Sequence, residues 1–173
     1  MTSNDMAPDL PSIRNWSDHQ VLLLVEGIQI GVAIDTLASR IGKGPDAVRR
    51  ARLKIKDHIH KALYEDMPKR GALWTVEEQE SLRQSFESGS DLPAVISHAG
   101  RTAGGILGQL VRMELVVLVG DTYHRVGANG KPARSLGYTW SDHVRLEMMA
   151  YGYELPDIPA ETNQEAQRPR ATC

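Results

Sequence analysis

A tryptophan-led pattern of residues occurs twice in the first two thirds of the chain, at identical spacing. Trp16 stands 15 positions before Gly31, and Trp74 stands 15 positions before Gly89. Further apolar and glycine positions match at equal offsets from the two tryptophans: Leu24 with Leu82, Ile28 with Phe86, Ile34 with Leu92, Gly42 with Gly100, and Val48 with Ile106. Because core and turn positions decide how a chain folds, the coincidence predicts a duplicated structural unit.

Each copy begins with a signal for the start of a helix. Ser17 with Gln20, and Thr75 with Glu78, have the spacing of a capping box, in which two side chains satisfy N–H groups at a helix N-terminus. In the first copy the pattern predicts helices over about 18–28, 34–41 and 45–64. In the second it predicts a helix that ends at Gly89, a helix over 92–99 and a third that Thr102 caps.

After Leu115 the pattern changes from helical to extended. Residues 115–119 and 122–126 are rich in β-branched residues and flank Gly120-Asp121, which predicts a β-hairpin, either a wing or a short packed ribbon. Residues 127–138 are expected to be a loop. Trp140 then opens the sequence Trp-Ser-Asp-His, which also occurs at Trp16, and predicts either a lone docking helix or a partial third repeat.

The predicted fold class is mainly α, with tandem trihelical helix-turn-helix modules, a short β-hairpin and a C-terminal partial repeat. The expected organisation follows the chain: a flexible N-terminus at 1–12, a first module at 13–66, a linker at 67–72, a second module at 73–115, the β-hairpin and loop at 116–138, the partial repeat or docking helix at 139–159, and a disordered tail at 160–173.

Composition restricts the possible partners and compartments. The net charge is -2 and the isoelectric point is near 6.3, so nucleic-acid binding would need a local basic patch. Cys173 is the only cysteine, so neither a disulfide framework nor a cysteine zinc site can form within one chain. The N-terminal residues lack a signal-peptide pattern, and the longest apolar run, residues 21–25, is too short to span a membrane. We therefore expect a cytoplasmic protein, which would be nucleoid-associated if such a patch binds DNA.

The repeated frame of Trp, Ser or Thr, Glu or Gln, apolar residues and a turn glycine resembles the Myb/SANT-like (homeodomain-like) helix-turn-helix modules of bacterial and phage proteins. The match is best over Trp74 to Leu115 and fair over Trp16 to Ile55, which together make up roughly half the chain. The resemblance implies a trihelical fold in each copy and DNA binding through the third helix of each.

Residue spacing agrees with part of this resemblance. In a helix-turn-helix a small residue lets two helices approach, a glycine four positions later supplies the turn, and an apolar residue six further on fills the core. Ala38, Gly42 and Val48 fit this spacing. The second copy keeps the turn glycine but has Ile96 in place of the small residue, which predicts a wider angle between its helices.

The expected DNA contacts lie mainly in the first copy, because its third helix is rich in cations. Arg49 and Arg50 are expected to meet base edges in a major groove, and the other cations to hold phosphates. The first-copy set is Lys43, Arg49, Arg50, Arg52, Lys54 and Lys56. The second copy offers Arg101, Thr102, Gln109 and Arg112. The alternative is a solvated helix face, or for Arg101 a capping residue at the surface.

Apolar residues at predicted outward positions suggest a second kind of partner. Leu107 and Val111 take outward positions on the third helix of the second copy. The apolar run at 21–25 covers nearly the whole circumference of its helix, so a unit that buries only one helix face cannot bury both Leu22 and Val25. These residues are expected to pack against the hairpin, another unit, another subunit or a protein partner. SANT-type modules have the same fold as DNA-binding Myb modules, but they can bind proteins. A protein-interaction module is therefore the alternative function.

The sequence offers no clear catalytic or metal-binding motif. His58 and His60 are two positions apart, so on a helix they point in different directions. The glycines at 127–130 lack the spacing of a phosphate loop. We therefore expect no enzyme activity, metal or cofactor. The predicted function is sequence-specific double-stranded DNA binding by a small transcriptional regulator; a DNA-binding subunit of a recombination, packaging or conjugation complex would use the same contacts.

Overall fold

The computed structural model of the protein describes residues 10–154. It is mainly helical and contains a small three-stranded antiparallel sheet, which confirms the predicted fold class at this level of detail. The described residues fall into two compact units. The first contains residues 10–58 and Glu154, and the second contains Ile59–Tyr153. The expected tail at 160–173 lies outside the described residues, as does most of the expected N-terminal segment.

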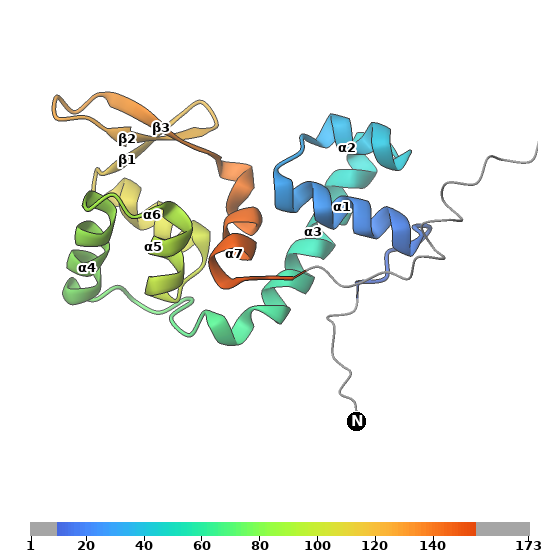
Figure 1. Ribbon diagram of the computed structural model, residues 1–173, viewed down its shortest axis with the longest axis horizontal. Helices are drawn as coiled ribbons and strands as arrows, with labels where there is room; N and C mark the ends of the chain where they lie inside the picture. The colour runs from blue at the N-terminus through green and yellow to red at the C-terminus, as the bar shows by residue number, and fades with distance from the viewer. Residues whose placement is uncertain (1–9, 155–173) are drawn as a thin grey trace, which may run out of the picture. The chain divides into compact units, whose positions relative to one another are not determined.

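The first unit contains α1 (Asp18–Ile30), α2 (Ile34–Ile41) and the greater part of α3 (Pro45–Ala62) (Figure 1). The predicted capping box forms: the Ser17 hydroxyl accepts the N–H of Gln20, and the Gln20 side chain accepts the N–H of Ser17. Helix α2 ends at Gly42, whose φ of 80° lies in the left-handed region that favours glycine.

Close packing between α1 and α2 depends on a second glycine. A Cβ atom at Gly27 would lie 2.1 Å from the side chain of Leu37, so a larger residue at this position would displace that buried leucine. On α3 the buried residues Val48, Ala51 and Ile55 recur at helical spacing and define one face. The rest of that helix is therefore left for other contacts.

The second unit begins with the end of α3 and a short 3₁₀ turn, η1 (Tyr64–Asp66). Three helices follow, α4 (Val76–Glu87), α5 (Leu92–Ala99) and α6 (Ala103–Arg112). The Thr75–Glu78 capping box forms at the start of α4, and Thr102 caps α6 through the N–H of Gly105, both as predicted.

The sheet consists of β1 (Val116–Val119), β2 (Thr122–Val126) and β3 (Pro132–Thr139), in that order. Strands β1 and β2 form the predicted hairpin, with Val116 opposite Arg125 and Val119 opposite Thr122. The prediction of a loop holds for residues 127–131 but was wrong for residues 132–138, because β3 pairs with β2 there. Strand β3 is mostly exposed, so neither of its faces needs apolar residues, and its pairing with β2 is irregular. Its sequence therefore lacks the alternation of polar and apolar residues that usually identifies a strand.

Helix α7 (His143–Tyr151) follows a 3₁₀ turn, η2 (Trp140–Asp142), and lies beside α5 and α6 (Figure 1). Leu146 of α7 joins a core cluster with Leu107 of α6, Val116 of β1 and Tyr123 of β2. Leu107 is completely buried, so the prediction that it faces outward was wrong. Packing of Leu107 against the hairpin was one of the predicted possibilities, and this contact forms.

Two polar side chains of α7 fix it to its neighbours. The Glu147 carboxylate, 1% exposed, accepts the N–H of Ala103 at the start of α6 (2.8 Å) and also pairs with Nε2 of His60. The Tyr151 hydroxyl donates to the carbonyl oxygens of Ile96 and Arg101. Burial raises the pKa of Tyr151 from its ordinary value of 10 to about 12, so the hydroxyl keeps its proton well into the alkaline range.

Replacement of Glu147 by alanine should lower the free energy of unfolding by about 3 kcal/mol, because the Ala103 N–H loses its acceptor and the side chain leaves a cavity. Chemical denaturation at neutral pH measures the loss. Met149→Ala is the matched control on α7, since Met149 is 45% exposed, and it should change stability by less than about 0.5 kcal/mol. Equal stability of the two variants would contradict a structural role for the buried carboxylate.

Candidate nucleic-acid interface

The six cations predicted for the first unit all lie on α3 or in the turn before it. Arg49, Arg50, Lys54 and Lys56 are exposed, while Lys43 and Arg52 are partly buried. Helix α3 as a whole carries six Arg and Lys residues against two Asp residues. The local basic patch that the near-neutral chain would need for nucleic-acid binding is therefore present on this helix.

The helical repeat divides these cations between two flanks of the exposed side of α3. Measured from the buried face at 100° per residue, Arg49 and Lys56 fall on one flank, and Arg50 and Lys54 fall on the other. Between the flanks, opposite the buried face, lie three residues that are not basic: Asp46, Leu53 and Asp57. Cationic character is therefore strongest at the sides of the helix.

The two flanks differ in their partners. Arg49 donates to the Asp46 carboxylate at 2.7 Å, an ion pair between exposed side chains that contributes little to stability. Within residues 10–154, Arg50, Lys54 and Lys56 make no hydrogen bond or ion pair. These three side chains can therefore meet an anion without first giving up a partner of their own.

An open hollow of about 350 Å³, which we call the basic hollow, lies beside the Arg50 flank. Its lining contains four cations and no acidic residue: Ile13, Arg14, Asn15, Trp16, Lys43, Ala47, Arg50, Ala51 and Lys54. The Lys43 ammonium donates to the carbonyl oxygen of Asn15 at 2.7 Å and lies 5.8 Å from the centre of the Trp16 ring. Arg14 was not predicted from the sequence, because only the fold brings the segment before α1 next to α3.

Arg101 does not occupy the position predicted for it. Its side chain is 4% exposed, and its guanidinium donates to the carbonyl oxygens of Ala72 (2.7 Å) and Leu73 (3.1 Å). It also donates to the Glu78 carboxylate at 3.1 Å and stacks 3.9 Å from the centre of the Trp74 ring. The prediction that Arg101 binds a DNA phosphate is therefore withdrawn, since its side chain is buried and both terminal nitrogens donate within the unit.

The same contact shifts the titration of Glu78. The hydrogen bond from Arg101 is the largest cause that lowers the pKa of this carboxyl below its ordinary value. A group with a lowered pKa in the folded state stabilises the fold above its ordinary pKa, and this contribution is lost as the pH falls through the lowered value. The pair therefore stabilises the second unit at neutral pH and weakens in acid.

The other residues predicted for the second unit are only partly accessible. Gln109 is 6% exposed, because α6 is covered by the sheet and by α7 and buries more than one face. Gln109 is therefore withdrawn as a DNA contact as well. Thr102 is partly buried and uses its hydroxyl as the cap of α6, whereas Arg112 is exposed at the end of that helix.

The predicted apolar partner surface is also reduced. Leu107 and Val25 are buried, at 0% and 1% exposure, and Leu22 is partly buried. Val111 is 40% exposed. Among the four residues predicted to meet a partner, Val111 is thus the one with a large accessible area.

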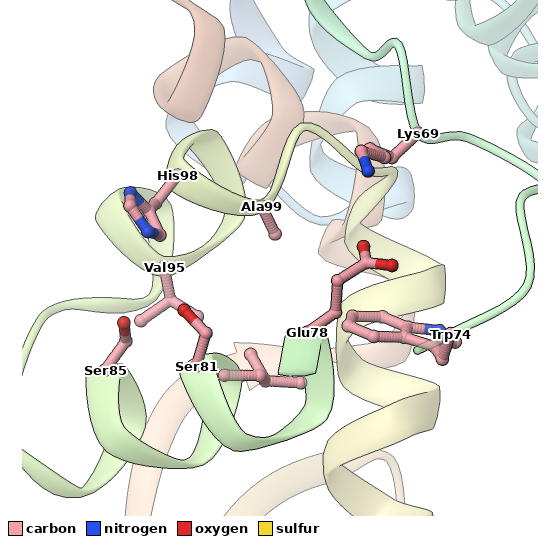
Figure 2. Close-up of a pocket in the computed structure, with 9 residues that line it drawn as sticks. Lys69, Trp74, Glu78, Ser81, Ser85, Val95, His98 and Ala99 are labelled. Carbon is pink, nitrogen blue, oxygen red and sulfur yellow. The ribbon is translucent and has the colours of Figure 1, made fainter. Parts of the chain in front are cut away.

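A second hollow, of about 210 Å³, lies between α4 and α5 (Figure 2). Ser81 and Ser85 of α4 face His98 of α5 across it, and Trp74 and Glu78 stand at its other end. In the part of the chain that the structure describes, no hydrogen bond joins His98 to either serine. The hollow thus shows no coupled pair of nucleophile and base.

Residues 10–154 contain neither a candidate metal cluster nor a membrane span. No group of three or more His, Cys, Asp or Glu residues there could hold a metal ion. No helix in the same range has both the length and the apolar character needed to cross a membrane.

The chain matches no protein-family model, and neither a curated protein nor a solved structure matches it. A functional assignment therefore depends on the side chains of this chain and their placement.

Replacement of Arg101 by methionine should lower the free energy of unfolding by about 3 kcal/mol, because two carbonyl groups and the Glu78 carboxylate lose a buried partner. Urea denaturation at neutral pH gives the value. Arg112→Met removes an exposed arginine from the end of the next helix, and it should change stability by no more than about 0.5 kcal/mol. If Arg101→Met is as stable as Arg112→Met, Arg101 does not hold the turn.

Proposed function

We propose that the protein binds double-stranded DNA sequence-specifically through α3 and the turn before it, as a small regulator of transcription. The observation that carries the proposal is the basic surface of α3, on which Arg50, Lys54 and Lys56 are exposed and have no partner within residues 10–154. Lysine and arginine side chains that neutralise phosphates release condensed counterions, which supplies much of the free energy of DNA binding.

In this proposal α1–α3 and α4–α6 are two helix-turn-helix modules of the Myb/SANT-like kind. Two features support it. The helices α2 and α5 have equal lengths of eight residues, and each ends at a glycine in the left-handed conformation, Gly42 with φ of 80° and Gly100 with φ of 64°. These glycines also stand at equal offsets from Trp16 and Trp74. A shared turn at a shared position favours one ancestral unit that was duplicated.

The two units would then have different tasks. In the first unit α3 enters a major groove, Arg49 reaches base edges, and Arg52, Lys54 and Lys56 hold the backbone. In the second unit Arg101 stabilises the fold, and α6 is largely covered by the sheet and α7. Arg112 is the exposed cation that the second unit retains on α6 for an adjacent DNA segment.

Replacement of both Arg49 and Arg50 by alanine should weaken binding to a fluorescent DNA duplex by about tenfold or more, because each arginine donates charged hydrogen bonds. Anisotropy titrations between about 50 and 200 mM salt also give the slope of log affinity against log salt. The magnitude of this slope should fall by about 1 for each phosphate that the variant no longer neutralises.

The control variant removes equal charge from β2–β3, with Lys131→Ala and Arg134→Ala, since both residues are exposed and lie outside the proposed surface. It should keep the affinity of the unmodified protein. Absence of salt-dependent binding by the unmodified protein, or an equal loss in both double variants, would refute the proposal.

A protein-interaction module is the second candidate, and one observation favours it. Leu53 is 63% exposed and lies between Asp46 and Asp57 on the outward side of α3, where a DNA-reading helix ordinarily carries polar or basic residues. Leu73 and Val76 near the start of α4 are also exposed, at 92% and 77%. In this alternative Leu53, and not the flanking cations, makes the decisive contact.

A further inference from the structure

The basic hollow combines one sign of charge with apolar walls. Arg14, Lys43, Arg50 and Lys54 contribute its charge, and no Asp or Glu lines it. Ile13 (8% exposed) and Ala51 (3% exposed) contribute buried apolar surface beside them. A cleft lined by one sign of charge with walls of low dielectric concentrates the electric field and attracts counter-ions of the opposite sign.

The cations of the hollow are largely uncompensated. Within residues 10–154, Arg14, Arg50 and Lys54 have no hydrogen-bond or ion-pair partner. Arg49, by contrast, lies on the other flank of α3 and is already paired with Asp46. Four positive side chains around one hollow repel each other, and a bound anion would remove that repulsion.

One of these cations is held in place before any ligand arrives. Lys43 donates to the carbonyl oxygen of Asn15 and lies near the Trp16 ring, so its ammonium is held in place at the lining of the hollow. Arg50 and Lys54 follow at helical spacing from Ala47 along one side of α3, and Arg14 approaches from the segment before α1. Cations from three segments of the chain thus converge on one volume.

We propose that the basic hollow binds a phosphate of the nucleic-acid backbone. Arginine is suited to phosphate because its planar guanidinium can donate two parallel hydrogen bonds, while lysine acts as a point charge. The volume of about 350 Å³ is at the lower end of the range for ligand pockets, so the hollow can admit a phosphate with part of its sugar. This inference rests on the proposed function and specifies how α3 lies on the DNA.

The proposal changes the role of Arg50. Its side chain lines the hollow, so it would hold the backbone together with Arg14 and Lys54, and would add affinity without sequence preference. Arg49, on the opposite flank, remains the residue that reads base edges. Sequence preference should therefore depend on Arg49, and a sequence-independent share of the affinity should depend on Arg14.

The test uses the full chain with Arg14→Ala and Lys54→Ala, two exposed positions that contribute to the hollow. Affinity for two DNA duplexes of unrelated sequence should fall by the same factor, about tenfold, and the magnitude of the salt slope should fall by about 1. The control is the Lys131→Ala with Arg134→Ala variant, which removes equal charge and should bind both duplexes like the unmodified chain.

A second measurement reports on the hollow without DNA. In ¹⁵N-resolved NMR spectra of the unmodified chain, inorganic phosphate should shift the indole N–H of Trp16 and the side-chain N–H groups of Arg14 and Arg50. The Arg14→Ala with Lys54→Ala variant should lose the shift at Trp16. The indole of Trp140, which is 60% exposed and lies outside the hollow, serves as the internal reference.

The outcomes separate the two proposals. Salt-dependent duplex binding that the hollow variant retains in full, without phosphate shifts, overturns the assignment of the hollow and leaves the proposed function standing. Phosphate shifts at Trp16 without duplex binding overturn the proposed function and retain an anion site. Absence of both overturns both.

Discussion

The hydrogen bonds of the buried Arg101 guanidinium hold two distant segments of the second unit together. Arg101 lies in the turn between α5 and α6. Its guanidinium donates to the carbonyl oxygens of Ala72 and Leu73, which precede α4, and to the Glu78 carboxylate in the first turn of α4. Burial of a guanidinium costs free energy that hydrogen bonds offset, and here both terminal nitrogens donate while the Trp74 ring covers the face of the group. The turn between α5 and α6 is thereby fixed to the start of α4 and the residues before it.

Other contacts reach the same turn from elsewhere in the second unit. The N–H of Lys69 donates to the carbonyl oxygen of Gly100, and the Tyr151 hydroxyl donates to that of Arg101. The Glu147 carboxylate accepts the N–H of Ala103, at the start of the helix that follows the turn. In a helix-turn-helix the turn before the third helix would contact DNA, but the α5–α6 turn uses its side chains for contacts within the second unit. We therefore propose that the main DNA contact is made by α3 of the first unit.

Local signals in the sequence predicted a large part of the fold. Both capping boxes, the turn glycines Gly42 and Gly100 and the hairpin around Gly120 involve residues close together in the chain, so their chemistry can be read from spacing alone. Strand β3 was missed because an exposed, irregular strand depends on pairing with β2 and not on its own pattern.

The candidate site was predictable only in part, because accessibility is a property of the folded chain. The cations of α3 are exposed as the helical pattern indicates, but Arg101, Gln109 and Leu107 are buried by elements that lie far from them in sequence. Arg14 was missed for the converse reason, since it lies on no helix and comes to line the same hollow as Lys43 and Arg50 only in the folded unit. Charge on a helix is readable from sequence, whereas its neighbours in space are not.

We propose that the first unit makes the principal contact with DNA through α3, and that the α5–α6 turn of the second unit does not. Hydrogen–deuterium exchange of the full chain, with and without a DNA duplex, can locate the contact. We expect slower exchange on DNA binding over residues 43–56 and unchanged exchange over residues 100–110. Protection confined to residues 100–110, or absent from residues 43–56 in a protein that binds the duplex, would contradict it.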